Sequence, residues 1–203
     1  STWRQWSNNC EHETCKKHGN MVLSDEQARL FYKLWIPLLD YVNQKYQLVK
    51  ELYGMSSPKG LPPESVAKIT KKLWEDISVI DEYLNLQSEK MATEQVSIIE
   101  GWKKVVHGRF IVERHLKSGS VLVSCDRNDE VYIVSGIYSS WREMLDGYPM
   151  PQIVQASLIP FENVIIHDGI IQPYGICLGK NMADEARQIY LKAKENGCLH
   201  KVI

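Results

Sequence analysis

Residues 98–116 read IIEGWKKVVHGRFIVERHL, and they divide the chain into two kinds of pattern. Upstream of this segment, apolar residues recur every three or four positions, which is typical of amphipathic helices. Downstream of Gly108, short runs rich in Val, Ile and Tyr alternate with turn residues, which is typical of strands. We therefore expect the chain to change from helices to strands between residues 104 and 110.

The upstream part predicts three amphipathic helices. Ser24 and Gln27 have the spacing of a capping box, and helical apolar spacing then continues through Pro37, so we expect one long, kinked helix. A second helix should begin near Pro63, and Ser88 should cap a third. Because the connections are short, the three helices should form an antiparallel bundle.

The downstream part predicts six short strands and a last helix. Asp168 and Gly169 have the sequence of a tight hairpin turn, which would separate the last two strands. Asn181 should cap the last helix, and Gly197 should end it. The strands are expected over residues 109–116, 120–124, 130–137, 152–160, 163–167 and 170–178.

These patterns predict an α+β fold, because runs of helices are followed by runs of strands. An N-terminal helical bundle would precede a small antiparallel β-sheet or partly closed barrel and a C-terminal helix. We expect three parts: an N-terminal arm over 1–22, the helical bundle over 23–107, and a β-rich domain with the C-terminal helix over 108–203.

Composition excludes several classes of protein. The 203 residues carry 24 Lys and Arg against 25 Asp and Glu, and this balance argues against a dedicated, strongly basic nucleic-acid binder. No apolar run reaches the roughly 18 residues of a transmembrane helix. Five scattered cysteines do not form a disulfide framework, and no signal-peptide pattern is present. We therefore expect the protein to be located in the reducing environment of the cytoplasm.

Residues 158–174 read LIPFENVIIHDGIIQPY, which resembles a segment of an uncharacterised family of bacterial proteins. In that family a Leu-Pro-Phe run is followed by an Ile-Ile-Tyr-Asp-Gly hairpin, and here His167 stands in the place of the Tyr. The resemblance covers at most residues 109–197 and implies no established activity. Some similar proteins carry a Cys-rich metal-binding tail, whereas the Cys and His cluster of this chain lies at its beginning.

That cluster is a candidate zinc site. It places four ligands of the kind that zinc prefers within nine residues, although the spacing matches no common zinc finger. One alternative combines two of these ligands with Cys198 and His200, and another is a polar arm with incidental Cys and His. The four candidate ligands are Cys10, His12, Cys15 and His18.

Basic residues gather where the bundle meets the sheet, and they form a candidate site for nucleic acid or another anion. Strand alternation places residues 109 and 117 on one side and 114 on the other, so the five cannot all converge in a regular strand. An ordinary solvated face is the alternative. The five residues are Lys103, Lys104, Arg109, Arg114 and Lys117.

Familiar catalytic motifs are missing from the sequence. It contains no phosphate-binding loop, no dinucleotide fingerprint and no H-E-x-x-H motif. Cys125 could pair with His115 or His167 as nucleophile and base, but no glycine-rich elbow surrounds it. Cys177 is expected to be a small core residue.

We therefore expect a non-enzymatic binding or regulatory module with a protein partner. The alternative is a metal-dependent or Cys/His hydrolase-like enzyme with its site between bundle and sheet.

Overall fold

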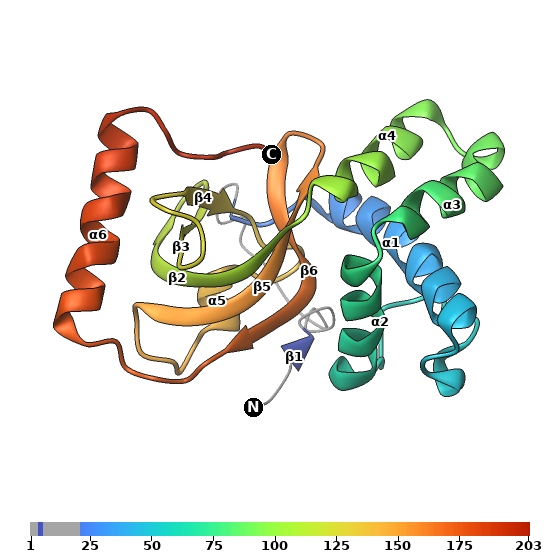
Figure 1. The fold of residues 1–203 in the computed structure, drawn as a ribbon, viewed down its shortest axis with the longest axis horizontal. Coiled ribbons are helices and arrows are strands. Elements are labelled where there is room, and N and C mark those ends of the chain that lie inside the picture. The colour runs from blue at the N-terminus through green and yellow to red at the C-terminus, as the bar shows by residue number, and fades with distance from the viewer. Residues whose placement is uncertain (1–3, 6–20) are drawn as a thin grey trace.

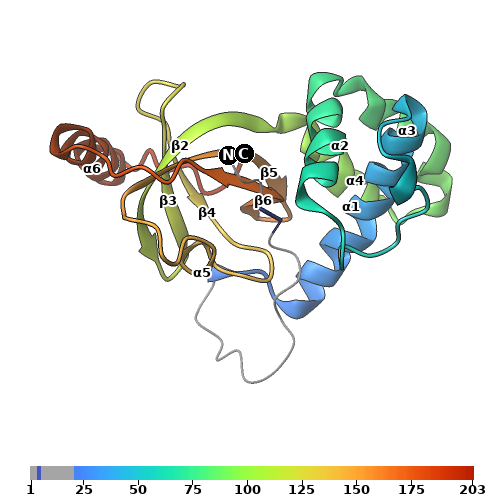
Figure 2. The same ribbon diagram turned by 90° about the horizontal axis from the view of Figure 1, so that it is seen from below.

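The computed structural model describes residues 4–5 and 21–203, and its fold is α+β. Figure 1 shows N-terminal helices at one end of an antiparallel sheet and a C-terminal helix, α6, at the other. The view in Figure 2 confirms that α6 and the N-terminal helices lie at opposite ends of the sheet. Among the described residues, no helix is both long enough and apolar enough to cross a membrane.

The N-terminal helices are more numerous than the sequence predicted. Asp76 divides the expected second helix, because its carboxylate accepts hydrogen bonds from the hydroxyls of Ser78 and Tyr46 and its backbone is not helical. Ser88 begins a short 3-10 turn rather than the third helix. The helices are α1 Asp25–Tyr46, α2 Pro63–Glu75, α3 Ser78–Gln87 and α4 Thr93–Gly101, and the 3-10 turns are η2 Lys50–Leu52, η3 Ser88–Lys90 and η4 Trp102–Lys104.

The first helix begins as the sequence predicted. The Ser24 hydroxyl accepts from the Gln27 backbone N–H, and the Gln27 side chain accepts from the Ser24 backbone N–H, which completes the capping box. The helix continues without interruption through Pro37, whose ring is exposed.

The sheet is open, with the strand order β1-β6-β5-β2-β3-β4, and each pair of neighbouring strands is antiparallel. The change to strands near residue 104 is confirmed, because η4 ends at Lys104 and β2 begins at Val106. A two-residue strand in the N-terminal arm was not predicted, and it pairs with the outer edge of β6. The strands are β1 Arg4–Gln5, β2 Val106–Leu116, β3 Gly119–Ser124, β4 Val131–Val134, β5 Gln152–Phe161 and β6 Val164–Pro173.

The predicted turn at Asp168 and Gly169 is wrong, because both residues lie inside the continuous strand β6. Leu158 pairs with His167 and Ala156 pairs with Ile171, so one residue of β5 faces three residues of β6. This is a β-bulge, and Gly169 at its centre has a φ of 93°. The hairpin between β5 and β6 turns instead at residues 162–163.

Both faces of the sheet are buried along much of their area. One face encloses an apolar core together with Trp141, which is 1% exposed in the short helix α5 Trp141–Met144. The other face packs against α6 (Lys180–Glu195) at one end and against the N-terminal helices at the other. Phe31 of α1 and Phe161 of β5 meet edge to face, with ring centroids 5.8 Å apart. Gly179 rather than Asn181 is the N-cap of α6.

Candidate functional site

The four candidate zinc ligands, Cys10, His12, Cys15 and His18, lie outside the described residues. Within residues 4–5 and 21–203, no group of three or more His, Cys, Asp or Glu side chains is arranged to hold a metal ion. Of the two residues in the alternative site, Cys198 is exposed and His200 stacks on Tyr132 with ring centroids 4.9 Å apart. The zinc site therefore stays a prediction.

The basic residues at the junction are mostly paired with carboxylates. Lys103 contacts Asp81 at 2.8 Å and also contacts Glu100. Arg114 pairs with Glu113, and its guanidinium lies 4.6 Å from the centre of the Tyr190 ring. Such pairing leaves less positive charge for a nucleic-acid backbone. Among the described residues, Lys104 and Lys117 form no ion pair.

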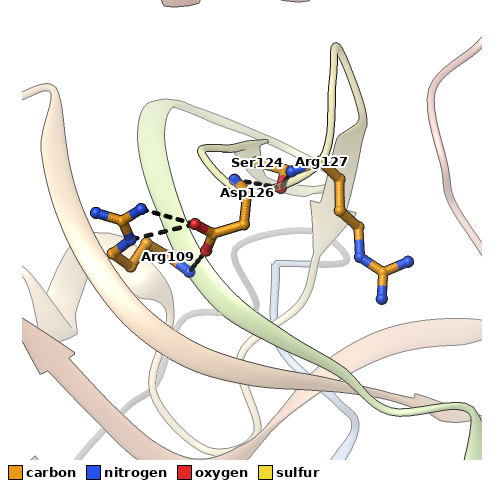
Figure 3. Close-up of polar contacts among 4 residues, drawn as sticks. All are labelled: Arg109, Ser124, Asp126 and Arg127. Atoms are coloured by element: carbon orange, nitrogen blue, oxygen red, sulfur yellow. Dashed lines mark hydrogen bonds and ion pairs between the residues drawn. The ribbon is translucent and has the colours of Figure 1, made fainter.

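Arg109 is held by the most complete of these pairs (Figure 3). Asp126 accepts from Arg109 Nη2 at 2.8 Å and from the Arg109 backbone N–H at 2.7 Å, and these bonds hold the pKa of Asp126 below its usual range. Ser124 Oγ accepts from the backbone N–H groups of Asp126 and Arg127, which fixes the turn. At Gly108 a Cβ would lie 2.8 Å from Asp126 Oδ2, so glycine permits this approach.

Two histidines pair with serines across neighbouring strands. His107 Nδ1 lies 2.7 Å from Ser157 Oγ, and burial lowers the pKa of His107. His115 Nδ1 lies at the same 2.7 Å from Ser120 Oγ. Each pair is a directly opposed cross-strand pair of an antiparallel ladder. Because the same His–Ser contact occurs twice, we interpret both pairs as hydrogen bonds that satisfy polar side chains within the sheet, and neither serine as an activated nucleophile.

The described cysteines are not placed beside a histidine base. Cys125, Cys177 and Cys198 are exposed and free, and none of the described hydrogen bonds joins a cysteine to a histidine. Although the Cys125 side chain is exposed, neighbouring atoms partly desolvate its thiol and raise its pKa, which disfavours the reactive thiolate. The prediction that Cys177 is a core residue is wrong, because β6 ends at Pro173 and Cys177 lies in the exposed segment that follows.

The bulge of β6 holds two buried titratable side chains. Asp168 accepts from Trp74 Nε1 at 2.8 Å and from the Ile170 backbone N–H at 2.9 Å, and burial raises its pKa to about 6. His167 Nδ1 accepts from the Gly169 backbone N–H at 3.0 Å, and burial lowers its pKa to about 3. Asp168 is 3% exposed and His167 is 1% exposed, so a substrate does not reach them.

A hollow of about 760 Å³ lies in the helical part of the molecule, and we call it the α1–α3 groove. Its aromatic part includes Tyr41 and Tyr83, whose ring centroids are 5.5 Å apart and whose planes are tilted by 51°. Tyr83 is buried and Tyr41 is half-buried. The groove is lined by Tyr32, Lys33, Pro37, Asp40, Tyr41, Gln44 and Lys45 of α1, by Met55 and Ser56, and by Tyr83 and Gln87 of α3.

The carboxylates at the α1–α3 groove are already engaged within the chain. Asp40 accepts from the Gly54 backbone N–H at 2.8 Å and from Gln44 Nε2 at 2.9 Å. Glu82, beside the groove, accepts from the Tyr41 hydroxyl at 2.7 Å and from the Lys45 ammonium. Both donors and acceptors remain for a ligand, because the Gln87 amide makes no hydrogen bond to any described residue and Glu82 Oε1 accepts from none of them.

The groove was not predicted from the sequence, although one signal for it was present. Lys33, Pro37, Tyr41 and Lys45 recur every fourth residue, which places them along one face of α1 opposite the buried stripe. An aromatic residue and a proline on that face distinguish it from an ordinary charged surface.

The chain matches no protein-family model, no curated protein and no solved structure.

Proposed function

We propose that the protein is a non-enzymatic binding module and that the α1–α3 groove receives an extended segment of a protein partner. The observation that carries this proposal is the groove itself, which combines tyrosine side chains and an exposed proline with polar side chains, such as Gln87, that make no hydrogen bond to any described residue. Recognition sites for peptides have this combination of apolar surface with a few placed polar groups.

The arrangement of reactive side chains supports binding over catalysis. A Cys/His enzyme requires its nucleophile and base within hydrogen-bond reach, and the described cysteines make no such contact. The buried pair at the bulge of β6 is held by bonds within the chain, and the Arg109–Asp126 pair is likewise satisfied internally. Asp168 and the Arg109–Asp126 pair therefore need no substrate to satisfy them, whereas His167 Nε2 is buried and has no hydrogen-bond partner among the described residues.

A selection experiment tests the proposal. Random peptides displayed on phage are selected on the whole chain, and each enriched peptide is synthesised and titrated against two variants. Ser56→Trp places an indole in the groove, whereas Ser57→Trp adds the same side chain at the neighbouring exposed position outside the groove lining. Thermal unfolding of both variants confirms that they fold.

We expect enriched peptides to lose about tenfold or more in affinity for Ser56→Trp, which corresponds to about 1.4 kcal/mol, and to bind Ser57→Trp like the wild type. Equal binding to both variants would place the peptides elsewhere on the molecule. That result, or the absence of any enriched peptide, would overturn the proposed function.

A further inference from the structure

We propose that the outer edge of β4 is a second interaction surface, where a short extended segment of a protein partner pairs in parallel and displaces the C-terminal tail, residues 199–203. The proposal is independent of the α1–α3 groove, because the described lining of that groove includes no residue of β4 or of the tail. Three observations carry it: the backbone bonds that the tail makes, the constraints that limit them, and the side chains that the edge receives.

β4 is the last strand of the sheet, and the C-terminal tail covers part of its outer edge. The chain leaves α6 through Gly197, whose φ is 66°, and returns to the sheet, where it ends (Figure 1). His200 donates its backbone N–H to the Val131 carbonyl at 2.8 Å, and the His200 carbonyl accepts from the Ile133 backbone N–H at 2.9 Å. Tyr132 and His200 therefore form a parallel bridge, so this edge accepts a parallel strand.

The tail uses half of the backbone groups that this part of the edge presents. The N–H and C=O groups of one strand residue point to the same side, so Val131 and Ile133 each direct a donor and an acceptor away from β3. His200 bonds to two of these four groups, and residues 198–203, all of which are described, make no hydrogen bond to the Val131 N–H or to the Ile133 carbonyl. A fully extended segment in the same register reaches both, through the positions two before and two after that of His200. A partner strand therefore makes four bonds where the tail makes two.

Two constraints explain why the tail pairs so little. The chain bends at Lys201 instead of continuing along β4, and Val202 is 58% exposed. At the other end, the Cys198 backbone N–H is bonded to the Ala193 carbonyl of α6 at 2.8 Å, which ties the start of the tail to the helix. A separate segment has neither the bend nor the tether, and it can extend along the whole edge.

The side chains beside the tail define the sequence that a partner segment needs. The His200 ring stacks on the Tyr132 ring, with centroids 4.9 Å apart and planes at 24°. Leu199 packs against the apolar core under α6, and Ile203 packs against the core on the opposite face of the sheet. We therefore expect a flat ring that stacks on Tyr132, with an aliphatic residue immediately before it. In an extended segment the second position after the ring lies on the same side as the ring, so an aliphatic residue there takes the place of Ile203.

The experiment measures whether a free peptide pairs with this edge once the tail is loosened. His200→Pro in the whole chain removes the N–H that bonds to Val131, since proline has no backbone N–H. Lys201→Pro is the matched control, because the Lys201 N–H makes no hydrogen bond to any described residue and the chain already bends there. Thermal unfolding of both variants confirms that they fold. The probe is a labelled peptide of residues 197–203 with the change Cys198→Ser, titrated by fluorescence anisotropy.

We expect the peptide to bind the His200→Pro chain about tenfold or more tightly than the wild type, because the tethered tail of the wild type competes with it. The Lys201→Pro chain should bind it like the wild type. Hydrogen exchange of the Ile133 amide gives a second readout: the amide should exchange faster in the His200→Pro chain and become protected again when the peptide binds.

Methylation of single backbone nitrogens in the peptide tests whether binding is strand pairing. In the proposed register the peptide N–H groups of His200 and Val202 face β4, whereas that of Lys201 faces away. Methylation at His200 or at Val202 should weaken binding about tenfold, and methylation at Lys201 should change it by less than about twofold. The inference is overturned if the peptide does not bind the His200→Pro chain, or if methylation at His200 or Val202 weakens binding no more than methylation at Lys201. Either result would show that the tail is a permanent cover of the β4 edge, and the proposed function of the groove would be unaffected.

Discussion

Trp74 of α2 donates its indole N–H to Asp168 of β6, with 2.8 Å between nitrogen and oxygen. This bond crosses from the N-terminal helices to the sheet, and the two residues are 94 positions apart in the chain. The bulge in β6 places Asp168 on the face of the sheet that α2 covers, and the Ile170 backbone N–H satisfies the second carboxylate oxygen. The bulge therefore has a structural purpose: it supplies the acceptor for a bond between two layers of the fold.

Removing the indole N–H should destabilise the protein through this one bond. Trp74→Phe leaves a buried carboxylate oxygen without its donor, and we expect the free energy of unfolding to fall by about 1–3 kcal/mol. A double-mutant cycle with Asp168→Ala, which removes both acceptor oxygens, measured by urea unfolding, isolates the pairwise energy. A parallel cycle with Trp141→Phe serves as the control, because Trp141 Nε1 has no hydrogen-bond partner in the described residues. Equal coupling in both cycles would contradict the assignment.

The bulge itself should depend on glycine. Gly169 has a φ of 93° and no heavy atom within 4 Å of the position of a Cβ, so Gly169→Ala tests backbone strain alone. We expect a loss of about 1–2 kcal/mol in unfolding free energy. Gly101→Ala, in the helical backbone of α4, should be close to neutral, because alanine favours the helix while its Cβ would lie 3.4 Å from Pro160 Cγ. A Gly169→Ala protein as stable as the wild type would show that the bulge tolerates side chains.

The change from helices to strands was predictable because hydrophobic periodicity reports how each segment is buried, and that period changes at Gly108. The bulge was not predictable, because an Asp-Gly pair such as Asp168 and Gly169 is suited both to a hairpin turn and to a β-bulge. Only the pairing of Leu158 with His167 and of Ala156 with Ile171 distinguishes the two, and pairing is a tertiary property. The break at Asp76 was hidden similarly, because the apolar spacing continues across it.

The candidate groove was only partly visible in the sequence. The recurrence of Lys33, Pro37, Tyr41 and Lys45 defines one side of it, but the hollow exists because α3 and residues 55–56 approach α1. Conversely, the basic junction was conspicuous in the sequence, and its charge is reduced by partners such as Asp126 that are distant in the chain. Charge counted along a sequence does not reveal which charges are paired.

Binding to nucleic acid should be weak and sensitive to salt. Because Lys103, Arg109 and Arg114 are paired with carboxylates, few cations are left to displace counterions from phosphates. Titration with labelled single- and double-stranded oligonucleotides should show no binding at physiological salt. Asp126→Asn, which weakens the hold on Arg109, should raise affinity at low salt. Tight binding that is insensitive to salt, or a strong sequence preference, would contradict this prediction.

Chelation should leave the folded core intact. The apolar clusters around Phe31, Phe110 and Tyr190 are formed by described residues and do not require a metal ion to hold their side chains together. We expect the same cooperative thermal transition with and without EDTA, followed by circular dichroism. A transition that disappears with EDTA and returns with added zinc would show that the Cys10–His18 segment contributes to folding.

The neighbouring side chains of His167 and Asp168 should have opposite effects on the pH dependence of stability. The pKa of Asp168 is raised from 3.8 to about 6, so between these values the folded protein holds a proton that the unfolded chain has released, and stability falls as pH rises. The pKa of His167 is lowered from 6.5 to about 3, so the unfolded chain binds a proton that the folded protein does not, and stability falls as pH falls. In the window from pH 3.8 to 6 the two effects largely cancel.

Single substitutions should reveal each effect. In Asp168→Asn only the effect of His167 remains, so the free energy of unfolding should fall by about 1.4 kcal/mol per pH unit relative to the wild type as pH is lowered through this window. In His167→Gln the relative slope should have the opposite sign. The slope is the readout, because either substitution also changes the absolute stability by altering buried hydrogen bonds. Curves for both variants that run parallel to the wild type in urea unfolding across this pH range would show that the bulge does not perturb these two groups.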